Sequence, residues 1–294
     1  MKAIPPILLN STNTTSTAPT SMDPAVWNVG TPYVFGNRVQ VAGTTNKIYE
    51  CIAVSVTGGN SPEIDVTKIT PKWVEIGGTN KYAMFDALRD TSTVTTTATS
   101  MTVLATLTTL ADSVGILRLS NVTQVVVKGY SVYPGTVVYN KTYNTTGLKN
   151  LIMFDLPTAV NLTVEVIFTG TAPLSVGSLV MGKYIQLGIL QTGSECLSLN
   201  FSSIDRDTFG IPYIIKRRSI PKLQLKSYIE ASAIQQLLAD RNTLNAVSAI
   251  WVGIENQTSN YYYNALIIQG FFREFSFEIN NPIGPMINLE IEET

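Results

Sequence analysis

The chain has 294 residues, a length that accommodates two or three domains. Its net charge is −1, and 14 % of its residues are charged, against about 25 % in typical soluble domains. The sequence has no basic stripe, which argues against nucleic-acid binding, and it has no histidine, the most common general base and metal ligand. We therefore expect no catalytic residues, no metal site and no cofactor.

A surface this poor in charge indicates large interfaces between subunits, although a soluble β protein coated with Thr, Ser and Asn would have the same composition. The two cysteines, Cys51 and Cys196, show neither zinc nor redox spacing and predict no disulfide. Residues 1–9 are too short and too interrupted by proline for a signal peptide. No apolar run reaches about 18 residues, so we expect no membrane insertion.

Two short regions open the chain. Residues 1–22 pass from an apolar stretch into a Thr/Ser/Asn tract that cannot bury a face, which predicts an arm or linker that becomes ordered only against a neighbouring subunit. Residues 23–78 form a small aromatic unit, in which two alternating strands at 38–41 and 48–54 are joined through 43–46 as a hairpin. Two glycines close this unit, and their conformational freedom predicts a hinge.

The rest of the chain is predicted to be mainly β, in two sandwich-like domains. Residues 79–170 contain short strands separated by Gly, Pro and Asn, which is typical of a β-sandwich. Residues 171–294 form a C-terminal β domain with one amphipathic helix over 228–240. In the last strand, Ile287, Leu289 and Ile291 are expected to face the core.

The aromatic unit carries a recognisable residue pattern. An early Trp, a Tyr, a Gly before a strand, a second Tyr and a late Trp occur at Trp27, Tyr33, Gly36, Tyr49 and Trp73. This pattern resembles the small chitin-binding-type carbohydrate-binding modules. The resemblance implies that Trp27, Tyr33, Tyr49 and Trp73 bind sugar rings, whereas a domain of about 55 residues also needs large aromatics to build any core. Tyr33 follows a proline in a turn-like stretch, and we expect it to be the most exposed of the four.

Further segments are similar to tail and baseplate proteins of tailed bacteriophages. The segments that carry this resemblance are residues 79–86, 182–188, 206–210, 251–253 and 270–275. It implies a virion structural protein, an adaptor or decoration subunit without a catalytic role, made in the cytoplasm of the host bacterium. Its partners would be other tail or baseplate proteins and copies of itself.

Two other functions stay open. The first is a host-attachment adhesin that binds surface glycans through residues 23–78. The second and weaker one is a cell-wall glycosidase, which needs two carboxylates facing one cleft. The nearest carboxylate pairs are Glu63 with Asp65 and Asp205 with Asp207, and nothing else in the sequence marks a cleft beside them.

Overall fold

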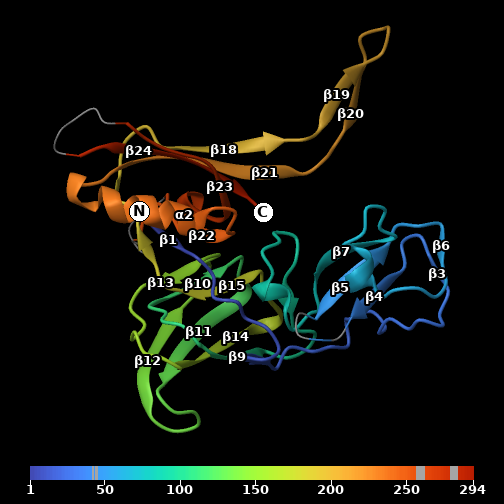
Figure 1. Ribbon diagram of the computed structural model, residues 1–294, viewed down its shortest axis with the longest axis horizontal. Coiled ribbons are helices and arrows are strands. Elements are labelled where there is room, and N and C mark those ends of the chain that lie inside the picture. The colour runs from blue at the N-terminus through green and yellow to red at the C-terminus, as the bar shows by residue number, and fades with distance from the viewer. Residues whose placement is uncertain (42, 44–45, 256–261, 279–283) are drawn as a thin grey trace. The chain divides into compact units, whose positions relative to one another are not determined.

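The computed structural model describes residues 1–41, 43, 46–255, 262–278 and 284–294. The chain is mainly β, as the sequence predicts (Figure 1). It divides into two compact units, one formed by residues 7–182 and the other by residues 1–6 together with 183–294. Among the described residues, no helix has the length and apolar character needed to cross a lipid bilayer.

The unit of residues 7–182 contains an antiparallel β-sandwich. Its larger sheet has the order β12-β11-β14-β9-β2, with β8 also paired to β14, and its smaller sheet has the order β13-β10-β15. The larger sheet consists of β2 (Thr14–Ser16), β8 (Thr93–Val94), β9 (Ser100–Thr106), β11 (Ser120–Tyr130), β12 (Val137–Asn144) and β14 (Thr163–Val176). The smaller sheet consists of β10 (Ser113–Leu117), β13 (Leu151–Met153) and β15 (Ser178–Gly182).

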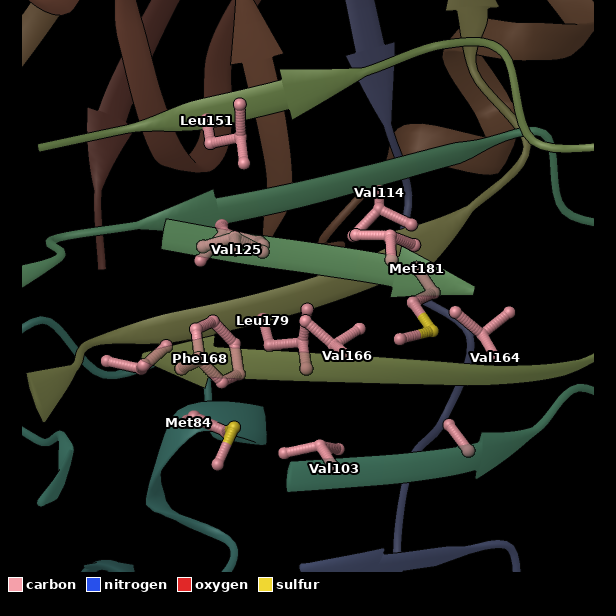
Figure 2. Close-up of a cluster of buried hydrophobic side chains, with 14 of the residues drawn as sticks. Met84, Val103, Val114, Val125, Leu151, Val164, Val166, Phe168, Leu179 and Met181 are labelled. Atoms are coloured by element: carbon pink, nitrogen blue, oxygen red, sulfur yellow. The ribbon is translucent and has the colours of Figure 1, made fainter. Parts of the chain in front are cut away.

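The sandwich core lies between these two sheets. Figure 2 shows Val103, Val166 and Phe168 from the larger sheet with Val114 and Met181 from the smaller one. In β9 the alternate residues Met101, Val103 and Ala105 are buried, which confirms the face predicted for this stretch. Because side chains alternate across a strand, the residues between them point away from the core.

The aromatic unit has a small core of its own within residues 7–182. Its strands and helix are β3 (Tyr33–Val34), β4 (Arg38–Val41), β5 (Lys47–Cys51), β6 (Ser55–Val56), β7 (Trp73–Gly78) and α1 (Pro62–Asp65). β4, β5 and β7 form one sheet, and β3 pairs with β6. The pairing of β4 with β5 confirms the predicted hairpin, although residues 42, 44 and 45 of its connection lie outside the described residues.

The prediction of a hinge at Gly77 and Gly78 is wrong. Both residues lie in β7 and pair with β5, and the Gly78 N–H donates to Asp86 Oδ2 at 3.0 Å. A Cβ atom on Gly78 would lie 3.0 Å from the backbone of Tyr82, next to η1 (Ala83–Phe85). Gly78 allows this close approach of two backbone segments, and Gly77 adopts a φ of +146° that favours glycine.

The second unit is built on one eight-stranded antiparallel sheet. Its order is β16-β1-β22-β23-β24-β21-β17, with β18 also paired to β21. The strands are β1 (Lys2–Ile4), β16 (Ile185–Gln186), β17 (Ile189–Leu190), β18 (Glu195–Asn200), β21 (Ser219–Tyr228), β22 (Ala249–Val252), β23 (Ile267–Glu278) and β24 (Met286–Glu293). A separate two-stranded ribbon, β19 (Ser203–Arg206) with β20 (Pro212–Ile215), connects β18 to β21.

Residues 1–22 are not a free arm, which corrects the prediction made from their composition. β1 lies between β16 and β22, and β2 pairs with β9. Ala3 is fully buried in the core of the second unit, where it pairs with Trp251. The polar tract is ordered by its own side chains, since Asn10 Oδ1 accepts from the Thr12 N–H at 2.9 Å. Strand pairing therefore orders a segment whose composition alone indicates disorder.

The domain boundary expected between residues 170 and 171 falls inside β14. This strand continues to Val176, where its last residues pair with β8, and β15 then completes the smaller sheet of the sandwich. The observed division lies between residues 182 and 183. The boundary shifts because β14 continues past residue 170 and pairs with β8 inside the sandwich.

The predicted helix and final strand are both present, with changed bounds for the helix. α2 (Ile234–Leu244) follows η2 (Ala231–Ala233), whereas Tyr228 still belongs to β21. In the final strand, Ile287, Leu289 and Ile291 are buried as predicted. A register shift between Phe272 and Glu274 in β23 adds one residue, so that Phe272, Phe275 and Phe277 pair with these three core residues. The short helix η3 (Asn264–Leu266) precedes β23.

Candidate functional site

The four aromatics predicted to bind sugar are mainly core residues of the small unit. Tyr33, Tyr49 and Trp73 are buried, and Trp27 packs half-buried against them. The rings of Tyr33 and Trp73 meet edge to face, with their centroids 5.2 Å apart. Burial, together with the charges of Glu75 and Glu63, raises the pKa of Tyr49 to about 12. These side chains therefore form the core that a small domain requires.

The expectation that Tyr33 is exposed is wrong. Its hydroxyl oxygen accepts a hydrogen bond from the Asn28 N–H at 2.8 Å, and only 8 % of the residue is exposed. The exposed aromatic of this unit is Phe35, of which 69 % is accessible. A tight turn presents Phe35 to solvent, since the Asn37 N–H donates to the Val34 carbonyl at 3.0 Å and Gly36 has a φ of +82°. The Phe35-Gly36 pair is a turn signal in the sequence that could have identified this residue.

One carboxylate of each pair found in the sequence, Asp65 and Asp207, has a structural role. Asp65 is buried, and its carboxylate accepts from Lys68 Nζ at 2.8 Å and from the Lys72 N–H at 2.6 Å. Burial alone would raise the pKa of Asp65, but these hydrogen bonds outweigh it and lower the pKa. Asp207 Oδ1 accepts from the N–H groups of Phe209 and Ile211 and so closes the turn between β19 and β20. Neither carboxylate is placed in a cleft to act on a substrate.

A shallow depression of about 200 Å³ lies on the solvent side of the eight-stranded sheet. Glu274 and Glu290 lie directly opposite each other there, on β23 and β24. A hydrogen bond from Lys222 lowers the pKa of Glu290, and the two charged atoms are 2.7 Å apart. A glycosidase requires one carboxyl group with a raised pKa as its acid, and the pKa of Glu290 is shifted in the opposite direction. The outward alternation of Asn288 and Glu290 in the final strand is the sequence signal for this face.

The most unusual surface of the chain is the hairpin that connects β18 to β21, which we call the apolar hairpin (residues 201–215). It contains β19 and β20, and Figure 1 shows it extending away from the eight-stranded sheet of its own unit. Its large apolar side chains are all at least one-third exposed: Phe201, Ile204, Phe209, Ile211, Tyr213, Ile214 and Ile215. Phe209 at the turn is 89 % exposed. Contiguous exposed apolar surface of this kind marks interaction sites.

The sequence did not predict this exposed surface, because the residues that form it have the pattern of a buried strand. Residues 211–215 are almost continuously apolar, and such a run is typical of a strand covered on both faces. In the structure, apolar side chains on both faces of the hairpin are exposed. Ile204 and Ile214 are cross-strand partners on one face, and Tyr213 and Ile215 lie on the other. One sequence signal did point to exposure: β19, which pairs with this run, has Ile204 as its only apolar residue.

No bound group can be assigned from the side chains. Among the residues that the structure describes, no cluster of three or more His, Cys, Asp or Glu side chains could hold a metal ion. Comparison of the chain with protein-family models, with curated proteins and with solved structures finds no match.

Proposed function

We propose that the chain is a structural protein of a tailed-phage virion, an adaptor or decoration subunit of the tail or baseplate that acts through protein–protein assembly. The observation that carries this proposal is the apolar hairpin, a ribbon with large exposed apolar side chains on both of its faces. A surface of this kind is costly in water and becomes favourable once a partner covers it. The assignment to a phage tail comes from the sequence resemblance.

The overall composition supports the same proposal. With 14 % charged residues, the chain has fewer solvating side chains than a typical soluble domain. Interfaces are depleted in charged residues and enriched in Tyr, Phe and other aromatics at their centres. Phe209 and Tyr213 supply aromatic side chains on the apolar hairpin, and isoleucines surround them.

The direct experiment is to locate the protein by immunogold electron microscopy of purified phage particles from cells that produce it. We expect label at the tail or its tip. A control antibody against a major capsid protein should label the head of the same particles. Particles that lack label at the tail, while the protein stays in the soluble fraction of the lysate, would contradict the proposal.

Glycan binding by the small unit is a second candidate function, and the exposure of Phe35 favours it. An exposed ring beside a fixed turn offers an apolar face of the kind on which sugar rings stack. A glycan array probed with the intact chain and with the Phe35→Ala variant tests this function. Binding that is lost in Phe35→Ala and kept in Val54→Ala, a control at another exposed apolar position of this unit, is the expected outcome.

We propose no catalytic role. This proposal rests on Asp65 and Asp207, whose carboxylates are occupied by hydrogen bonds within the fold, and on the lowered pKa of Glu290. Incubation with bacterial cell wall should release no reducing sugar. Release that disappears in the Glu274→Gln variant would revive the glycosidase hypothesis.

A further inference from the structure

The apolar hairpin has two open edges as well as two open faces. Among the described residues, β19 pairs only with β20, and β20 only with β19. An exposed strand edge presents unpaired N–H and C=O groups, which are a template for pairing with another strand. Natural proteins usually protect such edges, and the protecting features in these two strands are Asp205 and Arg206 in β19 and Pro212 at the start of β20.

The acidic and basic side chains of the apolar hairpin lie at opposite ends of the ribbon. Asp205 and Asp207 lie in the half next to the turn, whereas Lys216, Arg217 and Arg218 follow β20 at the base. Arg206 also lies near the turn, but its guanidinium donates to the Gly210 carbonyl at 2.9 Å. Asp205 and Asp207 outnumber Arg206, so the turn half is acidic in net charge, whereas the base is strongly basic.

We propose that the apolar hairpin is the contact between two copies of this chain, which pair antiparallel so that the turn of each hairpin lies beside the base of the other. This arrangement places Asp205 and Asp207 of one copy near Lys216 and Arg217 of its partner. It joins two ribbons into one sheet, which pairs an open edge of each copy and brings apolar side chains of the two copies side by side. A contact of this kind is isologous, with the same surface used by both copies.

The apolar area available is close to what a stable dimer needs. The seven exposed side chains of the hairpin offer on the order of 700 Å² per copy, against about 800 Å² per partner in a standard interface. The cross-strand pair Ile204 and Ile214 lies in the middle of the ribbon, where burial would be most complete. Pairing along an edge buries the part of this area that lies beside the partner's ribbon, so the hairpin supplies the centre of the dimer interface.

A lipid bilayer is a less suitable partner than a second copy. Asp205, Arg206 and Asp207 stand between Ile204 and Phe209, so insertion of the turn would carry three ionisable side chains into hydrocarbon. In a contact between two copies, these charges stay at the rim of the interface, opposite the basic residues at the base of the partner hairpin. The inference deepens the proposed function, because assembly through copies of the chain rests on a surface of this kind.

Sedimentation equilibrium of the full chain tests self-association. We expect a dimer for the wild type and a dissociation constant at least about 10-fold higher for Ile214→Asp. Ile69→Asp is the matched control, because Ile69 is fully exposed on the small unit, and it should leave the constant unchanged. A wild-type chain that is monomeric at about 0.1 mM, or equal weakening by both variants, would overturn the inference.

Cross-linking tests the antiparallel arrangement. Cys196 is the exposed one of the two free cysteines, so the background carries Cys196→Ser. Near the middle of an antiparallel pair, the Ile214→Cys variant should form a covalent dimer on mild oxidation, whereas Phe209→Cys at the turn should not. Cross-linking through Phe209→Cys in equal or higher yield would overturn the arrangement.

Two further outcomes separate the alternatives. Co-sedimentation with vesicles of phosphatidylcholine and phosphatidylglycerol, lost in Ile214→Asp, would assign the hairpin to a lipid surface and overturn the inference. A monomeric chain that is nevertheless found at the phage tail would reject the dimer and leave the proposed virion function in place. Dimerisation without tail labelling would do the reverse.

Discussion

β1 and the apolar hairpin are two short apolar β segments of the same unit, and they differ in what surrounds them. β1 has a paired strand on each side, and Ala3 within it is fully buried. The strands of the hairpin pair only with each other among the described residues, and Phe209 and Ile204 remain exposed. Similar side chains thus stabilise the fold in one place and are available to a partner in the other. The number of covered edges and faces decides which role an apolar strand has.

The comparison of β1 with the apolar hairpin predicts that the largest loss of stability follows a substitution at Ala3. An Ala3→Asp substitution places a carboxylate without a partner beside Trp251, and we expect a loss of about 3–5 kcal/mol in the free energy of unfolding. Urea denaturation followed by tryptophan fluorescence measures it. Leu8→Asp is the matched control in the same N-terminal segment, since Leu8 is 74 % exposed, and it should cost less than about 0.5 kcal/mol. If both substitutions cost equally little free energy of unfolding, residues 1–9 would behave as the free arm that their composition suggests.

A second prediction concerns the connection between the small unit and the sandwich. The Asn80 side chain donates to the carbonyls of Pro19 and Val94 and accepts from the Val94 N–H, and its backbone N–H donates to Asp23. Asn80→Ala removes the side-chain partner of three partly buried backbone groups, so we expect a loss of about 1–3 kcal/mol. Limited proteolysis should then cut between residues 78 and 95 before any other site. Asn144→Ala, at an exposed position, should cost about 0.5 kcal/mol. Unchanged proteolysis in Asn80→Ala would argue that this connection is not held by Asn80.

A third and smaller effect is expected at Asp65 and depends on pH. Its folded-state pKa is lowered, so its contribution is present above the unfolded-state value of about 4 and is lost as the pH falls through the folded value. Asp65→Asn should therefore cost about 1 kcal/mol at pH 7, and the difference from wild type should shrink below pH 4. The expected loss of stability is modest because Lys68 is half exposed and its ion pair with Asp65 is screened by solvent.

Denaturation midpoints at pH 7 and pH 3 give this difference directly. Glu63→Gln changes an exposed carboxylate of the same helix and should shift the free energy of unfolding by less than about 0.5 kcal/mol at either pH. A difference between Asp65→Asn and wild type that grows on acidification would contradict the assigned role of the Asp65 carboxylate.

The sequence predicts the longer alternating strands of this chain because their alternation reflects burial on one face. Met101, Val103 and Ala105 in β9 and Ile287, Leu289 and Ile291 in β24 have that pattern, and all six are buried. The fate of β1 could not be predicted, because three residues contain no period and their neighbours, β16 and β22, lie about 180 and 250 residues away. Long-range pairing of this kind depends on tertiary structure.

The candidate site was harder to predict than the fold. Large aromatics in a small domain can serve as its core or as a ligand platform, and Tyr33, Tyr49 and Trp73 are core residues here. Composition does not separate the two roles, because both require the same residue types. The apolar hairpin presents the opposite difficulty, since an apolar run in a sequence indicates burial and does not specify whether the covering surface belongs to the same chain.

The smallest predicted effect on folding lies in the apolar hairpin. Phe209→Ala should change the free energy of unfolding by less than about 0.5 kcal/mol when the chain is dilute, because the side chain contributes almost nothing to the core. Phe168→Ala is the reference with the same chemical change at a fully buried site in β14, and it should cost about 3–5 kcal/mol. The comparison is made at protein concentrations below the dissociation constant of the dimer, since association would stabilise the folded state by mass action. A loss for Phe209→Ala that approaches the loss for Phe168→Ala would mean that the hairpin packs within its own chain. Its apolar side chains would then be part of the fold, and the contrast with β1 would disappear.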